Sequence, residues 1–551
     1  MSAEHRSRAA QRYAERLQRE HPEWTPRATT SGIELQPVYT ADDINGLDEG
    51  RDLGLPGEFP YTRGTRPLGY QARRWTVRQV MGVGTAAQTN ARLRHLLREG
   101  QTGISLTGLG YAPFESSDAR AAGLVGRGGV WVDTLADMEE IFRDIPIDRV
   151  SINQTGNSIP AFCMIIAAAR RRGIPPEALS GTIQNYVLPW GEPPQYAGNH
   201  YVDIIEYCAR HLPRWNHSSI SVRNTREAGI SAAQEIAFGL YEGYYAADTA
   251  RARGADINRV GRRLTFFLNA ENDLLEEVAK FRAMRRMWAR LMRDRLGATD
   301  DRACQLRFHV QTSGVSLTAQ QPLNNVVRAT IHALAAVLGG AQSLSVNAFD
   351  EAYRIPSKFA QTLSVRTQQV IALESGLSNI VDPLGGSYAV EALTNAIEDA
   401  AWAILEPMTA LPAKAAWEAI SAASRDAAYT RQLAIDSGER PVVGVNCFVD
   451  ESDDEELDLG PARREEPDYD PAWRDLQIDR LTGVKARRDP ARWRAARERL
   501  QESYHAKENI IPPTLDAVES EMSIGEIVHA LTEVDGEEEL RRRGGFIIRL
   551  Y

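Results

Sequence analysis

Alternation of strand-like and helical segments is the feature that most constrains the fold of this chain. From about residue 100 onward, eight short segments with strand character are separated by stretches long enough to hold one helix each. The candidate strands are residues 103–109, 149–155, 181–188, 219–224, 264–270, 306–313, 343–349 and 379–381. Helical patterns lie between most of them, including residues 159–172, 227–247, 271–296 and 322–338. This order predicts an α/β protein with a parallel sheet, and eight βα units predict a closed (β/α)8 TIM barrel.

An open, doubly wound sheet is the alternative fold. Such a sheet commonly carries a glycine-rich phosphate turn after its first strand. The best candidate here, Gly82-Val83-Gly84, lacks the third glycine of that turn. The sequence therefore favours the barrel.

The predicted strands carry polar side chains where a buried strand normally carries Val, Ile and Leu. The runs are S-I-N-Q-T (151–155), T-I-Q-N (182–185), S-I-S-V-R-N (219–224), H-V-Q-T-S (309–313) and S-V-N (345–347). One such strand would be unremarkable, because polar residues also gather at strand ends. Five of them predict a barrel lined by small polar groups, able to admit an elongated polar ligand along its axis. Ordinary strand ends around a mobile core are the alternative interpretation.

Charge and cysteine content exclude several classes of function. A net charge of -10 gives no general attraction to nucleic acid or to anionic membranes. The four cysteines are scattered and form no C-x-x-C pair, so we expect neither a metal site nor disulfides. The chain begins with a charged segment and contains no apolar run of membrane-spanning length. These features predict a cytoplasmic protein that does not enter the membrane.

The chain divides by composition into three parts. We expect residues 1–60 to form an extended arm that wraps a partner subunit, and residues 61–410 to form the barrel. Residues 411–551 would be a linker followed by a helical extension, in which Ser523 and Glu526 make a capping-box pattern.

Several long motifs are similar to those of the large subunit of the adenosylcobalamin-dependent acyl-CoA mutases, the methylmalonyl-CoA, isobutyryl-CoA and 2-hydroxyisobutyryl-CoA mutase family. They are G-L-P-G-E-F-P-Y-T-R-G (54–64), R-R-W-T-V-R-Q (73–79), G-T-I-Q-N (181–185), R-E-A-G (226–229), R-L-T-F-F (263–267), H-V-Q-T-S-G-V-S-L-T-A-Q (309–320), N-A-F-D-E-A (347–352) and D-S-G-E-R-P-V-V-G-V-N (436–446). The resemblance extends from about residue 31 to the C-terminus. In that family the pantetheine chain of the substrate threads a barrel lined by small polar residues, as the strand composition also suggests.

The resemblance implies roles for the matching positions in coenzyme A binding. Phosphates require cationic donors, and arginine supplies paired ones. The residues implied to bind the substrate, from its phosphates to its acyl group, are Arg73, Thr76, Arg78, Val80, Ser105, Thr155, Thr182, Arg263 and Thr265. Taken singly, each arginine would be interpreted as a surface residue; the W-T-V-R-Q context favours a binding role.

Further matching positions are implied to act at the reaction centre. His309, Gln311, Gln184 and Asn224 would be the catalytic residues near the thioester. His309 is the only histidine inside a predicted strand, although a hydrogen-bonded core histidine would account for it without the family. Glu227, Asn347 and Glu351 would contact the adenosyl group. A first-turn acid that favours the helix dipole is the alternative interpretation of Glu351.

The implied chemistry is homolysis of a cobalt–carbon bond, hydrogen abstraction by the adenosyl radical and 1,2-migration of the thioester group. The family's cobalamin module carries a D-x-H-x-x-G loop whose histidine reaches cobalt, and this motif does not occur in the sequence. We therefore expect no cobalamin-binding domain in this chain and a separate small cobalamin-binding subunit that supplies the cobalt ligand. The N-terminal arm is a candidate contact surface, and a dimer of heterodimers is the expected assembly. A G-protein chaperone is a further candidate partner.

Four departures from the family bear on the substrate. Val80 stands where methylmalonyl-, isobutyryl- and 2-hydroxyisobutyryl-type enzymes have Tyr, Phe and Ile. The segment after Asn185 is shortened and loses the arginine that grips a malonyl carboxylate, which Arg223 would have to replace. Asn224 replaces the usual histidine and cannot act as a general acid. Residues 108–110 read Gly-Leu-Gly in place of Phe-Asp-Leu.

These departures favour a branched or hydroxylated acyl-CoA, of the isobutyryl, 2-hydroxyisobutyryl or pivaloyl type, over a malonyl substrate. A methylmalonyl-CoA mutase with a remodelled site and a non-catalytic mutase subunit remain alternatives, the latter favoured by the missing histidine. A barrel hydrolase or lyase has little support, because no metal triad, nucleophile elbow or paired carboxylates occur at the strand ends.

Overall fold

In the part of the chain that the structure describes, the strands form two parallel sheets of five strands each. The computed structural model describes residues 8–109, 113–156, 158–185, 194–449 and 469–535. The first sheet has the order β1 (Thr76–Val77), β10 (Ser343–Ser345), β9 (Phe308–Thr312), β8 (Leu264–Ala270) and β7 (Ser218–Ser221). The second has the order β2 (Val80–Met81), β3 (Gly103–Leu106), β4 (Ser151–Gln154), β5 (Gly181–Ile183) and β6 (Trp215–Asn216). All pairings are parallel, so the predicted α/β class is confirmed.

Two short chain segments connect the sheets. Arg78 and Gln79 alone separate β1 from β2, and His217 alone separates β6 from β7. At the first junction the amide of Arg78 donates to Leu344 of β10 over 3.0 Å, while the carbonyl of Val77 accepts from Thr102 beside β3 over 3.0 Å. In the described part of the chain the strands are grouped as two sheets and not as one closed barrel.

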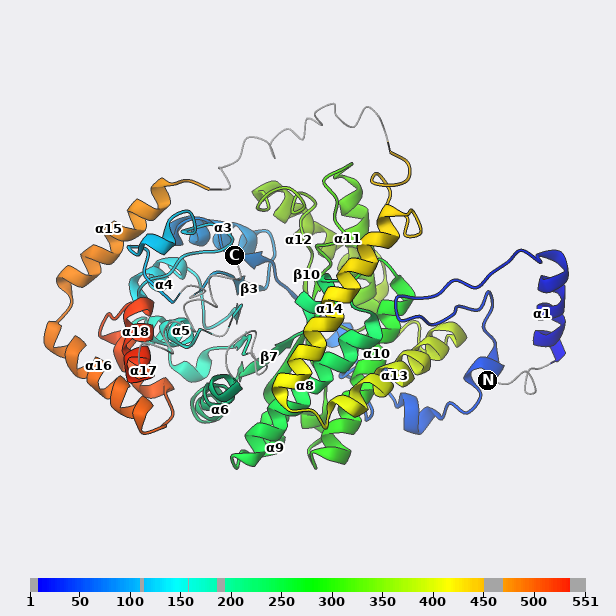
Figure 1. Ribbon diagram of the computed structural model, residues 1–551, viewed down its shortest axis with the longest axis horizontal. Helices are drawn as coiled ribbons and strands as arrows, with labels where there is room; N and C mark the ends of the chain where they lie inside the picture. Colours follow the sequence, from blue (N-terminus) through cyan, green and yellow to red (C-terminus); the bar gives the residue numbers. More distant parts are fainter. Residues whose placement is uncertain (1–7, 110–112, 157, 186–193, 450–468, 536–551) are drawn as a thin grey trace.

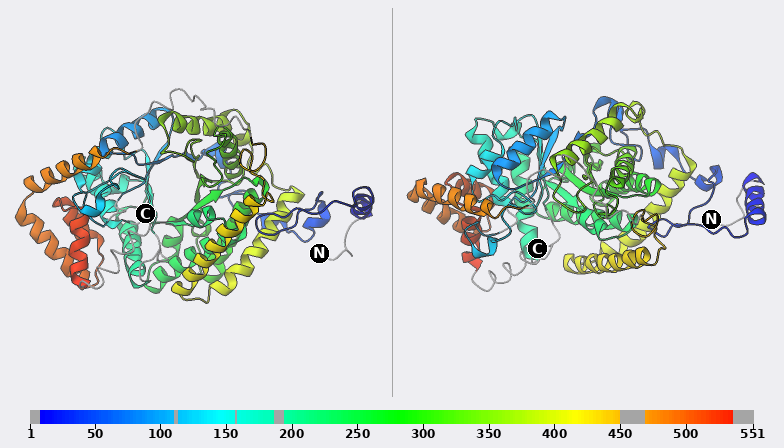
Figure 2. Two further views of the ribbon diagram at one scale, coloured as in Figure 1. Left: turned by 45° about the horizontal axis from the view of Figure 1, so that its top comes forward. Right: turned by 90° about the horizontal axis from the view of Figure 1, so that it is seen from above.

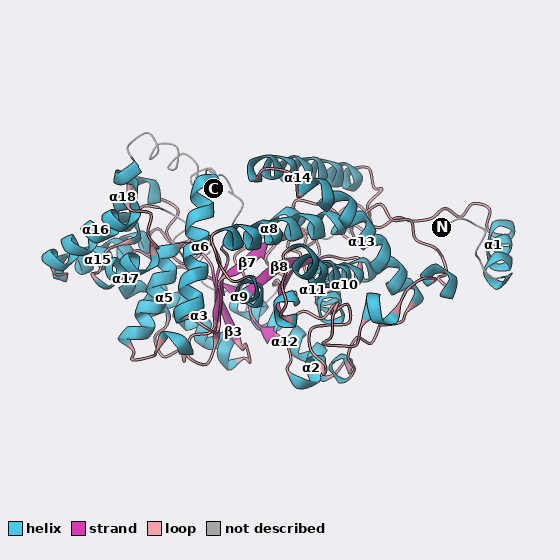
Figure 3. Cartoon of the chain, turned by 90° about the horizontal axis from the view of Figure 1, so that it is seen from below, coloured by secondary structure: helices cyan, strands magenta, loops and turns pink. Residues whose placement is uncertain are grey.

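Helices surround both sheets, as the view in the left panel of Figure 2 and the cartoon in Figure 3 show. Those of the central region are α2 (Gly69–Ala72), α3 (Ala86–Arg98), α4 (Leu135–Ile141), α5 (Ile159–Arg171), α6 (Pro194–His211), α7 (Arg223–Glu227), α8 (Ala232–Ala252), α9 (Ile257–Arg263), α10 (Leu274–Arg290), α11 (Asn324–Leu338), α12 (Lys358–Leu373) and α13 (Tyr388–Met408). Each sheet has its own apolar core. Phe266 of β8 packs edge-on against Trp288 of α10 with centroids 5.0 Å apart, and Phe162 of α5 meets Trp215 of β6 at 5.7 Å.

The predicted eighth strand, residues 379–381, is wrong. Leu377–Asn379 forms a 3-10 turn, η8, after Gly376, and Ile380 is 63% exposed. Two apolar residues in a row are not held in an extended conformation unless a neighbouring strand forms hydrogen bonds with their backbone. The strand that the prediction lacked is formed by β1 and β2 together, and it begins within the 73–79 motif.

Other predicted boundaries of strands and helices also differ from those in the structure. The predicted strand 219–224 ends at Ser221, because residues from Arg223 onward form α7. The predicted helix 227–247 is therefore two helices, α7 and α8, separated by Gly229 at φ 110° and by Ser231, which caps α8. Residues 186–188 of the predicted strand 181–188 lie outside the described residues.

The N-terminal segment begins with α1 (Arg8–Glu20), which projects away from the sheets at the right of Figure 1. Further along, Thr30 and Ser31 bind Glu276 of α10 through both backbone amides and both hydroxyls, at 2.7–3.1 Å. Beyond α13, α14 (Ala413–Asp436) runs alongside the helices of the first sheet.

The last four helices pack on the side of the second sheet, at the far end of the molecule from α1 (Figure 1). They are α15 (Ala472–Arg487), α16 (Pro490–His505), α17 (Ile511–Glu519) and α18 (Ile524–Asp535). Gln477 of α15 donates to Asp133 and Asp137 over 3.0 Å each. The predicted capping box is confirmed by reciprocal bonds of 3.0 Å between Ser523 and Glu526. None of the helices in the described ranges combines the length and the apolar character needed to cross a membrane.

Candidate active site

The carboxylate of Glu227 is held at the carboxyl end of the first sheet. It accepts hydrogen bonds from the backbone amides of Gly314 and Val315, at 2.9 and 2.7 Å, in the loop that follows β9. Asn269, at the end of β8, donates to it over 3.1 Å. Arg223, one helical turn earlier in α7, forms an ion pair with it at 3.1 Å. Glu227 is therefore fixed by three separate elements of the sheet edge.

His309 lies in the middle of this sheet. It is paired in register with Ser343 of β10 and Phe267 of β8, and its Nδ1 lies 2.9 Å from the Ser343 hydroxyl. Burial, with the nearby charges of Arg78 and Arg223, lowers the pKa of His309 well below its usual value. Its Nε2 is buried and has no hydrogen-bond partner among the described residues. The site therefore presents a neutral imidazole with one open nitrogen.

Gln311 and Asn347 form a second polar pair beside His309. The Gln311 side chain donates to Asn347 Oδ1 over 2.7 Å, and the Asn347 backbone amide donates to the Thr312 hydroxyl over 2.8 Å. The Nδ2 amide of Asn347 is buried without a partner in the described part of the protein. It lies close to Gly314, where an added Cβ would come within 3.1 Å of it. An open amide donor therefore lies at the same sheet edge as Glu227.

Glu351 follows in the loop after β10. Its side chain is accessible to solvent, yet the surrounding protein desolvates it and raises its pKa to about 7. The positive charge of Arg223 opposes this rise, and the negative charge of Glu227 adds to it. A carboxyl group that titrates near neutrality thus belongs to the same electrostatic cluster as Glu227 and Arg223.

In the second sheet, polar side chains are linked across neighbouring strands. Asn153 donates to Ser105 over 2.8 Å, and Asn216 donates to Thr182 over 3.0 Å. Val80 of β2 is the register partner of Ser105. The Thr155 hydroxyl donates to the carbonyl of Leu106 over 2.6 Å, and Gln184 accepts from the amide of Gly156 over 3.3 Å. The predicted polar residues of these strands are thus linked to their neighbours within this sheet.

Arg78 connects the two sheets. It is buried, and its guanidinium donates to the Ser151 hydroxyl of β4 over 2.7 Å. Burial lowers its pKa to about 10, so it stays cationic at neutral pH. Its Nε has no partner among the residues described. A buried cation with an open donor is expected to meet an anionic or polar ligand.

The other predicted phosphate-binding residues lie at the opposite, amino end of the first sheet. Arg73 ends α2 just before β1, and Arg263 ends α9 just before β8, in which the Thr265 hydroxyl donates to Ser218 over 2.8 Å. Thr76 lies in β1, next to Ser343. β8 alone is seven residues long, about 23 Å at the rise of a parallel strand. The cationic and acidic ends of the sheet are therefore far apart.

Two arginines at this amino end were not singled out from the sequence. Arg66 donates to the carbonyl of Arg73 over 3.1 Å, and Arg307 immediately precedes β9. Burial, with the charges of Arg263 and Arg66, lowers the pKa of Arg307 to about 10. None of these four arginines forms an ion pair within the described ranges. The signal was present in T-R-G-T-R (62–66) and in the arginine before F-H-V-Q-T, since a cation next to a strand end adds to a phosphate site.

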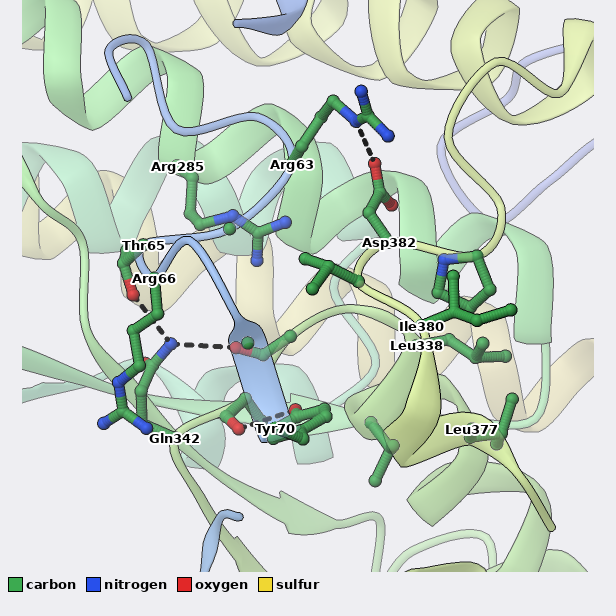
Figure 4. Close-up of a pocket in the computed structure, with 17 residues that line it drawn as sticks. Arg63, Thr65, Arg66, Tyr70, Arg285, Leu338, Gln342, Leu377, Ile380 and Asp382 are labelled. Carbon is green, nitrogen blue, oxygen red and sulfur yellow. Dashed lines mark hydrogen bonds and ion pairs between the residues drawn. The ribbon is translucent and has the colours of Figure 1, made fainter. Parts of the chain in front are cut away.

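The remaining predicted site residue, Asn224, is exposed and accepts a hydrogen bond from Arg223 over 3.3 Å. A cavity of about 50 Å³ lies near the amino end of the first sheet and is shown in Figure 4. Its wall includes Arg66, Tyr70 and Gln342, but it lies away from the residues around Glu227. It is therefore not the predicted reaction centre.

The residues at the carboxyl end would fit the adenosyl group that the family resemblance implies. Carboxylates accept hydrogen bonds from paired ribose hydroxyls, and Glu227 and Glu351 supply two of them. Asn347 offers the open amide donor for a ring nitrogen or a hydroxyl.

Comparison with known proteins gives one consistent result. The family profile described as methylmalonyl-CoA mutase matches residues 28–537. The 2-hydroxyisobutanoyl-CoA mutase large subunit of Aquincola tertiaricarbonis is 39% identical over an alignment of 533 positions that covers 92% of each chain. The methylmalonyl-CoA mutase of Rhizobium meliloti is 37% identical over 95% of this chain and 74% of its own length. The mitochondrial methylmalonyl-CoA mutase of Homo sapiens is 35% identical over 97% of this chain and 74% of its own length.

Proposed function

Because the chain belongs to the methylmalonyl-CoA mutase family of cobalamin-dependent isomerases, we propose that it is the catalytic large subunit of an adenosylcobalamin-dependent acyl-CoA mutase. The reaction would be the radical 1,2-migration of the CoA-thioester group, a carbon-skeleton isomerisation. The observation that carries this proposal is the separation of charges along the strands. Arginines that form no ion pair with any described residue lie at the amino end, and the Glu227 cluster lies at the carboxyl end, as an elongated CoA thioester with its phosphates and its reacting group at opposite ends requires.

The polar residues between these ends would hold the thioester. His309 is neutral and has an open nitrogen, so it can hydrogen-bond the thioester carbonyl without adding charge. Gln311 and Gln184 offer further amide groups, and Asn224 would take the position of the missing histidine. Glu227, Asn347 and Glu351 would fix the adenosyl ribose. The bound cofactor supplies the radical chemistry, while these residues orient the groups and exclude water.

The two sheets would be the two halves of the (β/α)8 barrel. The strand order supports this, because the split segments 76–81 and 215–221 each take part in both sheets. Counting each split segment once gives eight strands, and Arg78 reaches from the first sheet to Ser151 of the second. The domain division that we propose is an arm over residues 1–60, the barrel over 61–410 and a linker with helices over 411–551.

Cobalamin would be bound by a separate small subunit, in a dimer of heterodimers. The chain matches nearly the whole of a relative that is named a large subunit, which supports this arrangement. Exposed apolar side chains near the carboxyl end of the first sheet, Val315, Val327 and Phe448, offer a surface for this subunit in addition to the arm. A G-protein chaperone would be a further partner.

The substrate would be a branched or hydroxylated acyl-CoA and not a malonyl ester. Val80 is the register partner of Ser105, and its side chain is smaller than the Tyr, Phe or Ile of the other mutase types, which would leave room for a branched acyl group. Among the described residues, Arg223 is the candidate to replace the missing carboxylate-binding arginine, and that cation is already paired with Glu227. A second carboxylate at this point would compete with Glu227 for one positive charge.

The test is reconstitution of the purified chain with a small cobalamin-binding subunit and adenosylcobalamin. We expect no turnover by the chain alone, and turnover of branched or hydroxylated C4–C6 acyl-CoAs by the complex. Electron paramagnetic resonance of the complex with substrate should show a radical signal. A complex that binds adenosylcobalamin but forms no radical with any acyl-CoA would identify the chain as a non-catalytic subunit. Faster turnover of methylmalonyl-CoA than of the other esters would refute the substrate assignment.

A further inference from the structure

The side chain of Arg223 lies inside the cluster of residues that would surround the reacting group. Arg223 is the first residue of α7 and is separated from β7 by Val222 alone, and the side chains of Arg223 and Glu227 are only 17% exposed. A Cβ added to Gly314 would come within 3.7 Å of the Arg223 Nη2. The charge of Arg223 also acts on His309 and on Glu351. This guanidinium is therefore near the residues predicted to hold the thioester and near those predicted to hold the adenosyl group.

The hydrogen-bond donors of Arg223 are only partly used. A guanidinium has five N–H groups in a fixed plane. One terminal nitrogen binds Glu227 and the other binds Asn224, at 3.1 and 3.3 Å. The Nε is buried and has no partner within the described ranges. Buried polar groups are nearly always hydrogen-bonded, so a bound molecule is expected to supply the missing acceptor.

The charges around Arg223 restrict what that acceptor is. Glu227 already balances the guanidinium, and Glu351 is a second acid in the cluster. A carboxylate on the ligand would be a third acid facing one cation. An aliphatic group would leave the buried N–H without any acceptor. A hydroxyl group satisfies both conditions, because it is uncharged, accepts from Arg223 and can donate to a carboxylate.

We infer that Arg223 is a specificity-determining residue that selects an acyl-CoA with a hydroxyl group on its acyl carbon skeleton. This inference rests on the proposed function, since it assigns the substrate class of the same site. Arg223 acts on the acyl group and not on the coenzyme A end, which lies at the amino end of the strands. Replacing Arg223 should therefore change the affinity for one acyl group relative to another. It should not change the binding of the coenzyme A part that all the substrates share.

The experiment compares three CoA esters on the complex of the chain with its small subunit. Pivaloyl-CoA carries a methyl group where 2-hydroxyisobutyryl-CoA carries its hydroxyl, and methylmalonyl-CoA carries a carboxylate. Dissociation constants from titration calorimetry and kcat/KM values are measured for each. We expect the natural complex to favour the hydroxylated ester about ten- to a hundredfold, as one hydrogen bond to a charged group allows. Arg223→Met should abolish that preference, and Arg223→Lys should retain part of it.

Arg251→Met is the matched control, because Arg251 is an exposed arginine of α8 that pairs with the nearby Asp248. It should leave all three dissociation constants unchanged. An equal loss for all esters in Arg223→Met would assign Arg223 to the cofactor or to folding and would overturn the inference. A natural complex that binds the three esters equally, or that prefers methylmalonyl-CoA, would also overturn it. A natural complex that binds no acyl-CoA at all would instead refute the proposed function.

Discussion

Gln311 donates a hydrogen bond to Asn347 Oδ1 over 2.7 Å, and the Nδ2 amide of Asn347, beside Gly314, has no acceptor among the residues that the structure describes. The first residue lies on β9 and the second follows β10, so the pair joins two strands at the point where the adenosyl group is proposed to bind. The amide orientation of Asn347 thus depends on a neighbour that need not touch the cofactor itself.

Replacement of this neighbour tests that dependence. Gln311→Ala should weaken adenosylcobalamin binding by the reconstituted complex about fivefold, because the freed Asn347 amide loses its orientation. The double variant Gln311→Ala/Asn347→Ala should lose less than the two single losses combined, with a coupling of about 1 kcal/mol. Gln432→Ala, at an exposed position of α14, is the control. Fully additive losses would show that the pair does not act as a unit.

The raised pKa of Glu351 predicts a pH dependence of stability. Between the ordinary pKa of a glutamate, about 4.5, and its folded value of about 7, the folded protein binds more protons than the unfolded chain. This contribution is therefore fully present below pH 4.5 and is lost as the pH rises through 7. Glu351→Gln should flatten this part of the profile, measured as the urea midpoint between pH 5 and 8. An unchanged slope in the variant would contradict the assignment.

Arg226 is the central cation of a buried ionic cluster behind the site. It lies 3.0 Å from Glu277 and 3.6 Å from Glu235, and Lys280 binds Glu235 over 2.7 Å. Arg226→Met would leave buried carboxylates with too few partners and should lower the free energy of unfolding by about 3–5 kcal/mol. The exposed pair of Arg251 and Asp248 is the comparison, because Arg251→Met should cost less than about 1 kcal/mol. Equal effects in urea titrations would show that the cluster contributes no more than a surface pair.

Replacing an arginine at the amino end of the first sheet should weaken substrate binding without slowing the chemical step. Arg263→Met should raise KM for the acyl-CoA about tenfold and leave kcat unchanged, because phosphate contacts are the same in the ground and transition states. The loss should shrink at high salt and disappear with a pantetheine thioester that lacks the nucleotide. The adjacent Arg262 is the control, since its side chain is engaged by Asp300. A fall in kcat alone would place Arg263 elsewhere in the reaction.

The alternation of strands and helices could be predicted from the sequence because each element has a pattern of apolar residues that are close together in the chain. Which strands lie side by side could not be predicted in this way. Residues 379–381 have an apolar pair but no neighbouring strand, whereas Thr76–Val77 and Val80–Met81 are strands because β10 and β3 lie beside them. A two-residue strand has too little pattern of its own to be recognised without its partners.

The site was predicted in part for a related reason. Family motifs identified Glu227, His309 and Asn347, but not how their side chains interact. The predicted strand 219–224 placed Arg223 on extended backbone, where it has no relation to Glu227. The structure begins α7 at Arg223, and helical geometry then places these two residues one turn apart. A shift of one boundary therefore concealed the contact on which the substrate inference depends.

The four hydrogen bonds from Thr30 and Ser31 to Glu276 limit how far the N-terminus can be shortened. The Glu276 side chain is fully buried, and Thr30 and Ser31 also bond the first amides of α8, at Ala232 and Ala233, over 3.4 and 3.1 Å. A chain that started at residue 61 would remove these four donors from the buried carboxylate and two acceptors from the first turn of α8, which would keep only its Ser231 cap. Proteolytic removal of the residues up to the end of α1, at Glu20, leaves all of these hydrogen bonds in place. The tolerated cut therefore lies before residue 29, well inside the segment that composition alone treats as a detachable arm.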